Sequence, residues 1–530
     1  MSSATKLLQR AVLHERTGEL QESEEALRKL ITKHPKHGDA LHMIGGVILK
    51  QQRPADALVF LKRALESGVQ SAPLFSNLGA TCRQMGNYTE SIMYYSKAIE
   101  LDPNYCPAWF NLGILHEMQE DLEEARQCYE KTLELKPDFS AAHNNLANLL
   151  PKLAGGEELV LQHQEKAAAL KPQNAGYHNS LARTLYAEGR QEESLKEFER
   201  AIELSPQNTD YLVDCAVVLN MLKRLDEALG LLEKALQMEP NHLVALFNKG
   251  KINHNQRHFK TAACCYRQIL ELDPNHVAAT LDLAKCEREF KNYEESEKLF
   301  NRYQEITGNK KVTLLNLAFN KFYQQELIAS EELINQALEI DPKYVEALEA
   351  LAQIRRTQEN FPAERDILKQ VCVLKPKDVI CRYLLASCHY KLDEFKSCQD
   401  RLLQILNLDD THFPTWFLYG NLWGRHDSPD KAIECYEKTI ELCPHHASAH
   451  SNIAEMSRGS GDLRKARKHF ALSLQYRDEP GTRLKMSVLI PPIIESREQI
   501  SETRRELDEN LDRLIADQCF VHPDREVVPT

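Results

Sequence analysis

The sequence predicts an all-α fold, a right-handed superhelical solenoid of about fourteen helix–turn–helix repeats. Three regularities lead to this prediction. Prolines recur on a 34-residue grid, and a small residue recurs at a constant distance before each of them. Between successive prolines lie two segments whose apolar residues have helical spacing.

Residues 72–105 show one repeat in full. Its two halves, each long enough for about three or four helical turns, are separated by a turn at Gly86 and closed by Pro103. Gly79 in the first half and Tyr95 in the second follow the small/large pattern that lets two helices approach closely and fills the space between them. This unit resembles a tetratricopeptide repeat, a helix–turn–helix of 34 residues.

The register holds along most of the chain. The closing positions are Pro35, Val69, Pro103, Pro137, Pro172, Pro206, Pro240, Pro274, Gly308, Pro342, Pro376, Asp410 and Pro444. The small residues of the first helices are Ala11, Gly45, Gly79, Gly113, Ala147, Ala182, Ala216, Gly250, Ala284, Ala318, Ala352, Ala386, Gly420 and Ala454. We therefore expect the repeats to fill residues 1–480, with one insertion near residues 151–158.

Residues 481–530 depart from the repeat. A short apolar run is interrupted by Pro491 and Pro492, which a helix cannot pass through, and a charged helix is expected after them.

Composition limits the class of partner. Sixty-six basic residues stand against 78 acidic ones, and the net charge of −12 disfavours sequence-independent nucleic-acid binding, which needs phosphate neutralisation. No apolar run approaches the roughly 18 residues that span a bilayer, and residues 1–10 lack the apolar segment of a secretory signal. We expect protein partners and no nucleic-acid or membrane partner. Oligomerisation through the edges of the repeats is left open.

The fourteen cysteines contain no CxxC pair and fall mostly at helical positions. They are typical of reduced core residues in a cytoplasmic or nuclear protein, and they do not indicate a disulfide framework.

No motif of catalysis or cofactor binding is present. The sequence lacks a Gly-rich phosphate loop, HExxH, a nucleophile elbow and a paired-cysteine zinc signature, so we expect no catalytic residue, metal or cofactor. Cys443, His445, His446 and His450 are of metal-ligating types, but CPHH stands where another repeat has DPNH. We interpret this cluster as an ordinary closing turn and the helix after it.

The candidate binding site is a row of side chains two residues before the small residue of the first helix. An amide carries a donor and an acceptor, so a row of amides can hold an extended peptide backbone without reading its side chains. Local hydrogen bonding between adjacent helices is the alternative role. The row consists of Asn77, Asn111, Asn145, Asn248, Asn316 and Asn452, with Asp214 and Asp282 as shape analogues.

The chain resembles the protein O-GlcNAc transferase and Spindly family in residues 110–139, 142–150 and 484–514. That resemblance implies that the row lines a concave wall and holds an acceptor polypeptide, and that residues 484–514 lead to a glycosyltransferase domain that binds a nucleotide sugar. The catalytic histidine and nucleotide-binding residues of the family have no counterpart in this sequence. The resemblance therefore implies the substrate-recruiting half of such an enzyme.

Three functions follow as hypotheses. The first is a non-catalytic scaffold that binds extended client segments in its concave groove. The second is a truncated protein O-glycosyltransferase whose catalytic domain lies beyond residue 530. The third is docking of a chaperone through a two-carboxylate clamp, which needs Lys and Arg aligned with Asn over adjacent repeats. Lys249 and Lys251 flank Asn248, but the neighbouring repeats place Asp214 and Asp282 in the row instead, which disfavours a clamp.

Overall fold

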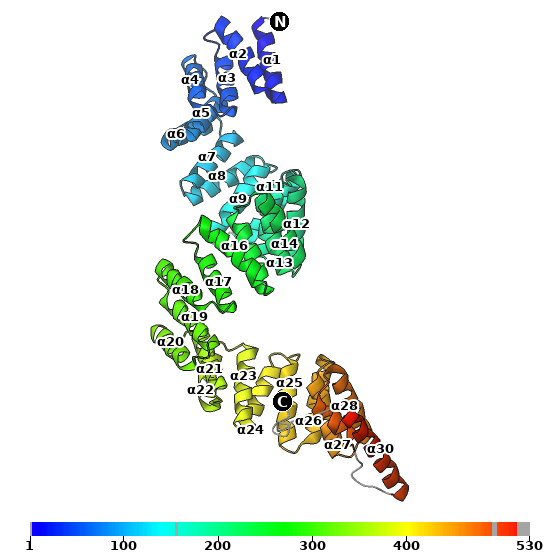
Figure 1. Ribbon diagram of the computed structural model, residues 1–530. Coiled ribbons are helices and arrows are strands. Elements are labelled where there is room, and N and C mark those ends of the chain that lie inside the picture. The colour runs from blue at the N-terminus through cyan, green and yellow to red at the C-terminus, as the bar shows by residue number, and fades with distance from the viewer. Residues whose placement is uncertain (1–2, 154–156, 490–495, 517–530) are drawn as a thin grey trace. The chain divides into compact units, whose positions relative to one another are not determined.

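The computed structural model of the chain describes residues 3–153, 157–489 and 496–516. Within these ranges all regular structure is helical, comprising thirty α-helices and one short 3₁₀-helix with no strand (Figure 1). The all-α prediction is therefore confirmed. The chain divides into two compact units, Met1–Ala279 and Thr280–Thr530, which are described separately.

The first compact unit contains eight helix pairs, with the 3₁₀-helix inside the fifth. Its elements are α1 (Ser3–Thr17), α2 (Leu20–Lys33), α3 (Gly38–Lys50), α4 (Pro54–Glu66), α5 (Ala72–Gln84), α6 (Tyr88–Leu101), α7 (Cys106–Met118), α8 (Leu122–Leu135), α9 (Ser140–Leu149), η1 (Leu150–Lys152), α10 (Glu157–Leu170), α11 (Ala175–Ala187), α12 (Gln191–Leu204), α13 (Thr209–Met221), α14 (Leu225–Met238), α15 (Leu243–Asn255) and α16 (Phe259–Leu272).

The second compact unit contains six helix pairs and two further helices. Its elements are α17 (Val277–Glu289), which begins just before the division, α18 (Tyr293–Thr307), α19 (Lys310–Tyr323), α20 (Leu327–Ile340), α21 (Val345–Thr357), α22 (Phe361–Leu374), α23 (Val379–Lys391), α24 (Phe395–Leu406), α25 (Phe413–Arg425), α26 (Pro429–Leu442), α27 (Ala447–Gly459), α28 (Leu463–Tyr476), α29 (Pro480–Ser487) and α30 (Arg497–Ala516).

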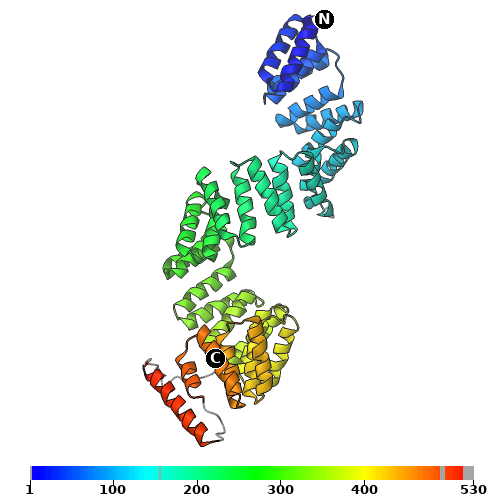
Figure 2. The ribbon, with the colours of Figure 1, turned by 90° about the vertical axis from the view of Figure 1, so that its right-hand side faces the viewer.

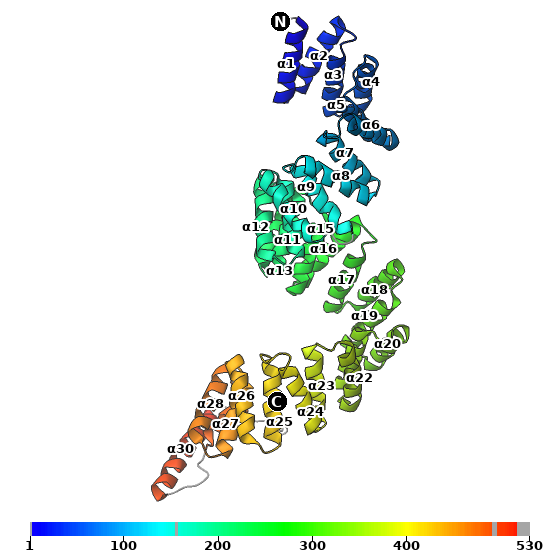
Figure 3. The ribbon, with the colours of Figure 1, turned by 180° about the vertical axis from the view of Figure 1, so that it is seen from behind.

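The fourteen helix pairs form a solenoid, as the sequence predicts. Within each compact unit a helix packs against the helices before and after it in the chain, and Figure 2 and Figure 3 show the pairs stacked side by side. We number the pairs as repeats one to fourteen in chain order.

A left-handed residue joins the two helices of nearly every repeat. Four of these turns use glycine, at Gly18, Gly86, Gly189 and Gly461. Nine use another residue at φ between 51° and 66°. These nine are Gln52, Glu120, Lys223, Arg257, Lys291, Gln325, Glu359, Asp393 and Asp427. Side chains with a Cβ adopt this conformation at a cost of about 1 kcal/mol each, so the turn is imposed by the packing of the two helices.

The small residue of the first helix is required by the side chain opposite. A Cβ built on Gly79 would lie 2.8 Å from the ring of Tyr95, which stands sixteen residues later on the second helix. The Oγ of Ser91 donates to the carbonyl of Gly79 at 2.7 Å and fixes the same approach. The other glycines in this register face Leu61, Tyr129, Tyr266 and Tyr436. The other serines in this register are Ser23, Ser194, Ser296 and Ser330.

A side chain on the first helix fastens the closing turn of the preceding repeat. The Nε1 of Trp109 donates to the carbonyl of Pro103 at 2.9 Å, six residues earlier. His143, His178, Arg382, Trp416 and His450 make the same contact in their repeats. The closing residue of these repeats therefore contributes its backbone carbonyl as a hydrogen-bond acceptor, in addition to the conformational restriction that proline imposes where it occupies this position.

Two of these histidines face a second histidine. The Nδ1 atoms of His143 and His163 are 2.8 Å apart, and those of His450 and His469 are 3.0 Å apart. Burial lowers the pKa values of His143 and His450, which favours neutral rings. In a neutral ring whose Nε2 donates to a carbonyl, Nδ1 accepts, here from the second histidine. Burial, and then the neighbouring histidine, lowers the pKa values of His163 and His469 to about 4.

Acid is therefore expected to loosen repeats five and fourteen first. An unfolded histidine has a pKa near 6.5, so between about pH 6.5 and pH 4 the unfolded chain binds more protons, and stability present above pH 6.5 is lost as the pH falls. Amide hydrogen exchange between about pH 7.5 and pH 5, corrected for intrinsic rates, measures this loss. Repeat six carries His178 against Glu197 at 2.6 Å in the same place, so His163→Glu and His469→Glu should reduce the acid sensitivity. An unchanged acid sensitivity in both variants would contradict this assignment.

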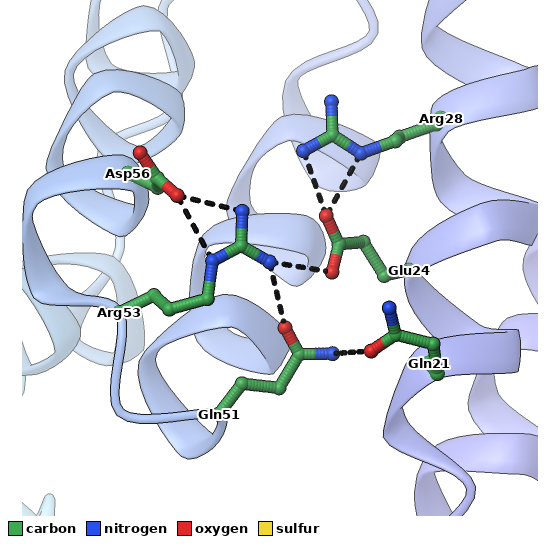
Figure 4. Close-up of polar contacts among 6 residues, drawn as sticks. All are labelled: Gln21, Glu24, Arg28, Gln51, Arg53 and Asp56. Carbon is green, nitrogen blue, oxygen red and sulfur yellow. Dashed lines mark hydrogen bonds and ion pairs between the residues drawn. The ribbon is translucent and has the colours of Figure 1, made fainter.

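A buried carboxylate ties the first repeat to the second (Figure 4). The side chain of Glu24 on α2 is 7% exposed and contacts the guanidinium groups of Arg28 at 2.7 Å and Arg53 at 3.1 Å. Arg53 precedes α4 and also pairs with Asp56 at 2.6 Å. Gln51 accepts from Arg53 at 3.1 Å, which completes the hydrogen bonding of the turn.

The segment after the last repeat covers the end of the stack. Leu489 packs with Ala454, Ala466 and Phe470 of repeat fourteen, and Lys485 on α29 pairs with Glu455 at 2.8 Å. The predicted break at Pro491 and Pro492 and the middle of the predicted insertion, residues 154–156, lie outside the described residues. A charged helix, α30, follows as expected.

Candidate functional site

The first helices of neighbouring repeats form a tighter wall than the second helices. In the first compact unit α3 contacts α5, α5 contacts α7, α11 contacts α13 and α13 contacts α15, and in the second unit α23 contacts α25. No two second helices make comparable contact in the described part of the chain. We call the surface made by the first helices of a compact unit its inner wall.

In the first compact unit, the predicted row lies along the inner wall, half-buried between neighbouring first helices. The Nδ2 of Asn77 donates to Nε2 of His42 on the preceding first helix at 3.0 Å, and burial lowers the pKa of that histidine. Asn145 donates to Oη of Tyr129 at 3.4 Å. Asn248 donates to a carbonyl of its own helix at 2.9 Å. Asn111 makes no hydrogen bond with any residue of the described chain.

In the second compact unit the row has the same character. Asn316 is buried and donates to the carbonyl of Val312 at 2.9 Å. Asn452 donates to Oδ1 of Asn421 at 3.0 Å.

Five of the six asparagines thus have their amino group engaged locally, three of them between helices and two, Asn248 and Asn316, within their own helix. In none of these five is the amide oxygen hydrogen-bonded within the described residues. The amide oxygen of each of these five asparagines therefore remains available as a hydrogen-bond acceptor along the inner wall.

The two aspartates differ from the asparagines. Asp214 accepts a hydrogen bond from Nε of Arg183, which lies on the preceding first helix, at 2.8 Å. Burial raises the pKa of Asp214. Asp282 pairs with Lys285 at 2.9 Å. Each carboxylate is neutralised by a basic residue of the chain, so these positions resemble the asparagines in shape but cannot donate a hydrogen bond when ionised.

A cavity of about 460 Å³ in the second compact unit contains one member of the row. Asn452 and Ser451 of α27 line it, together with Asn421 of α25 and Tyr436 of α26. Thr482 of α29 also lines it. The sequence placed only Asn452 here, because Asn421 follows the small residue instead of preceding it by two and so falls outside the register.

The hydrogen bonds of the cavity leave one donor and one acceptor side by side. The Oδ1 of Asn421 accepts from both Oη of Tyr436 at 2.8 Å and Nδ2 of Asn452 at 3.0 Å. Burial raises the pKa of Tyr436, which keeps its hydroxyl protonated as a donor. The Nδ2 of Asn421 is left to donate and the Oδ1 of Asn452 is left to accept. A peptide group offers the complementary carbonyl and N–H.

Charges at the rim of this cavity are balanced. Arg477 pairs with Glu479 at 2.8 Å, Lys485 pairs with Glu455 at 2.8 Å, and Arg425, which also lines the cavity, pairs with Asp393 at 3.8 Å. The cavity therefore presents neutral polar groups, which suit a peptide backbone better than an ion.

The cluster suspected of binding a metal has other contacts. His446 accepts from the N–H of Ala449 at 3.1 Å, and the ring of His445 lies 4.7 Å from that of Tyr476. Among the described residues no group of three or more His, Cys, Asp and Glu is arranged to hold a metal ion. The interpretation as a closing turn and helix agrees with these contacts.

Comparison with known proteins gives the same class. Sequence models described as tetratricopeptide repeat match residues 8–72, 70–138, 185–247 and 247–310. No curated protein matched the chain by sequence. Among solved structures, the Cut9–Hcn1 hetero-tetramer of the APC/C is 12% identical with a TM-score of 0.42, covering 86% of this chain and 96% of that chain. Yeast Tom70 is 16% identical with a TM-score of 0.42, covering 85% and 99%.

YrrB, described as a TPR protein with an unusual peptide-binding site, is 24% identical with a TM-score of 0.32 and covers 35% of this chain and 95% of that chain. At these identities the likeness concerns the fold alone. The helix pairs define an all-α repeat solenoid, and four stretches of the chain match models of the tetratricopeptide repeat. None of the described helices combines the length and apolar composition that a bilayer span requires.

Proposed function

We propose that this chain is a non-catalytic scaffold that binds extended segments of client polypeptides along its inner walls. The observation that carries the proposal is the donor and acceptor left side by side by Asn421 and Asn452 in a neutral cavity. The unbonded amide oxygens of Asn77, Asn145 and Asn248 offer further acceptors in the other compact unit. Backbone recognition of this kind is independent of the client's side chains.

Binding should depend on the amides and on the backbone of the peptide. Peptides selected by the full chain from a phage-displayed library are expected to lose about 10- to 100-fold in affinity for the variants Asn421→Leu and Asn452→Leu, since a buried amide loses its partner. N-methylation of one backbone N–H of the peptide should have a similar effect. Fluorescence anisotropy measures both. Asn407→Leu is the control, because Asn407 lies exposed at the end of α24.

The first compact unit is tested separately by the triple variant Asn77→Ala, Asn111→Ala and Asn145→Ala. Peptides that bind this unit should be weakened while the circular dichroism of the helices is unchanged. Affinity unchanged in both the triple variant and the cavity variants would remove the amides from the proposal.

The resemblance to the protein O-GlcNAc transferase and Spindly family supports a finer version, in which the scaffold recruits acceptor polypeptides for glycosylation. A truncated transferase with its catalytic domain beyond residue 530 is the alternative. Sequencing the reading frame past Thr530 and assaying sugar transfer from a nucleotide sugar separates the two. The thirteen described cysteines are free thiols, which favours a reducing compartment such as the cytoplasm or nucleus.

A further inference from the structure

One guanidinium group in the second compact unit is held by aromatic rings instead of by a carboxylate. The Cζ of Arg288 on α17 lies 5.6 Å from the ring centre of Phe319, 5.8 Å from that of Tyr323 and 6.0 Å from that of Phe300. Its Nε and Nη1 atoms are buried and have no hydrogen-bond partner among the described residues. Arginine stays protonated in proteins, so a positive charge is enclosed here without a counterion.

One other arginine in this register binds a carboxylate of the second helix. Arg356 stands four residues after the small residue of its first helix, as Arg288 does, and donates its Nε to Glu364 at 2.6 Å. In the repeat of Arg288 the residue that matches Glu364 is Ser296, whose hydroxyl is used by the carbonyl of Ala284 at 2.8 Å. This repeat therefore supplies the arginine and lacks the carboxylate.

The acidic residues near Arg288 do not fill that place. Glu287, next to it on α17, accepts from Nδ2 of Asn292 at 3.1 Å. Glu289 is exposed and forms no ion pair with Arg288 among the described residues, although its charge favours the protonated arginine. Burial acts in the opposite direction and is the larger effect on the pKa of Arg288, which it lowers.

We propose that Arg288 binds a carboxylate supplied by the client, the side chain of an aspartate or glutamate in the extended segment. This inference rests on the proposed function. Arg288 belongs to the first helix of its repeat, and two of its three rings belong to the next first helix, so the guanidinium lies on the inner wall. Its Nη2 is the guanidinium nitrogen that is not among the buried unpartnered atoms, and Tyr323, whose ring is one of the three around the group, is 53% exposed.

The rings also prepare the site for an anion. They fix the plane of the guanidinium before the client arrives, which lowers the conformational entropy lost on binding. They keep water from the buried nitrogens, which strengthens an ion pair formed at the exposed edge. The row of asparagines binds the backbone of the client and does not distinguish its side chains. Arg288 would add one contact with an acidic side chain, and this contact would fix how the client is aligned along the inner wall.

The test uses the full chain and the peptides selected from the phage-displayed library. Each peptide that contains an acidic residue is compared with its glutamine or asparagine counterpart by anisotropy. For at least one acidic position we expect the wild-type chain to bind the acidic peptide about 10-fold more tightly, the size of a partly exposed charged hydrogen bond. In Arg288→Met that preference should disappear. Arg288→Lys should keep part of it, because lysine retains the charge but not the planar fork.

Arg458→Met is the matched control, since Arg458 has the same register but already pairs with Glu455 at 2.9 Å. Its acid preference should equal that of the wild type. The hydrogen-exchange protection of α17 and α18 in Arg288→Met should be equal to or higher than that of the wild type, because a thioether fills the ring-lined site without an enclosed charge. This readout shows that a lost preference is not lost folding.

Failure of the inference and of the proposed function give different results. If peptides bind but show no acid preference, or keep it in Arg288→Met, the role of Arg288 is wrong and the scaffold function stands. If the library yields no peptide that the wild-type chain binds, both are wrong.

Discussion

Replacing Arg356 with alanine is expected to destabilise repeat eleven by about 3–5 kcal/mol, the usual effect of leaving a buried charge unpaired. Its partner Glu364 is 1% exposed and lies in the second-helix register where other repeats have serine. The carboxylate would then have to be protonated or drawn into water, and α22 (Phe361–Leu374) would lose its packing.

Replacing Glu364, the other partner of the ion pair, should have little effect on the stability of the repeat. Glu364→Ser restores the residue used by other repeats, whose hydroxyl donates to the carbonyl of the small residue, as Ser330 does to Ala318 at 2.8 Å. The side chain of Arg356 is 42% exposed, so its guanidinium can turn into water when the carboxylate is removed, whereas the enclosed carboxylate of Glu364 cannot do so when the arginine is removed. We therefore expect Arg356→Ala alone to destabilise the repeat and Glu364→Ser to change its stability by less than about 1 kcal/mol.

Local opening is the quantity to measure. A long repeat array need not unfold in one step, so a single midpoint for the whole chain would average over many repeats. Hydrogen exchange of the amides in α21 (Val345–Thr357) and α22 reports the opening free energy of this repeat alone. Equal protection in Arg356→Ala and wild type would contradict the prediction.

A second large effect is expected at Gly420. A Cβ on this residue would lie 2.5 Å from Cε1 of Tyr436, and the ring has little room because it is 2% exposed. Gly420→Ala should therefore cost about 1–3 kcal/mol through displaced packing. Because the hydroxyl of Tyr436 donates to Asn421, the displacement should also weaken peptide binding in the cavity.

The chain suggests the compensating change. Other repeats pair alanine with leucine at these two positions, as Ala386 with Leu402. Tyr436→Leu added to Gly420→Ala should recover most of the stability and none of the lost peptide affinity. Gly230→Ala is the control, because nothing lies within 4 Å of its Cβ in the interior of α14. That change should stabilise its helix by up to about 1 kcal/mol. A destabilised Gly230→Ala or a neutral Gly420→Ala would contradict the argument.

The repeats could be predicted because their constraints are local and periodic. A glycine such as Gly79 and a ring such as Tyr95 recur at fixed spacing, and a grid of prolines marks each closing turn, so one repeat gives the pattern for the others. The class and the number of helix pairs followed from that pattern alone.

The site was predicted only in the part that shares this register. Asn452 was found because it lies two residues before Ala454. Asn421 was not found, because its role depends on the hydroxyl of Tyr436 and on the amide of the next repeat, and no spacing within one repeat encodes that meeting. Arg288 was also missed. The rings around it belong to two repeats, and the sequence does not show whether an arginine has a carboxylate partner in the folded chain.

The left-handed joints between paired helices have a consequence for the chain as a whole. Nine of them carry residues such as Lys223 and Asp393, where glycine would relieve steric conflict without losing a contact that packs the core. Each of these nine turns therefore lowers the stability of its own repeat slightly, and the cost is distributed over nine repeats. Glycine at any one of these turns is therefore expected to raise the stability of its own repeat by up to about 1 kcal/mol.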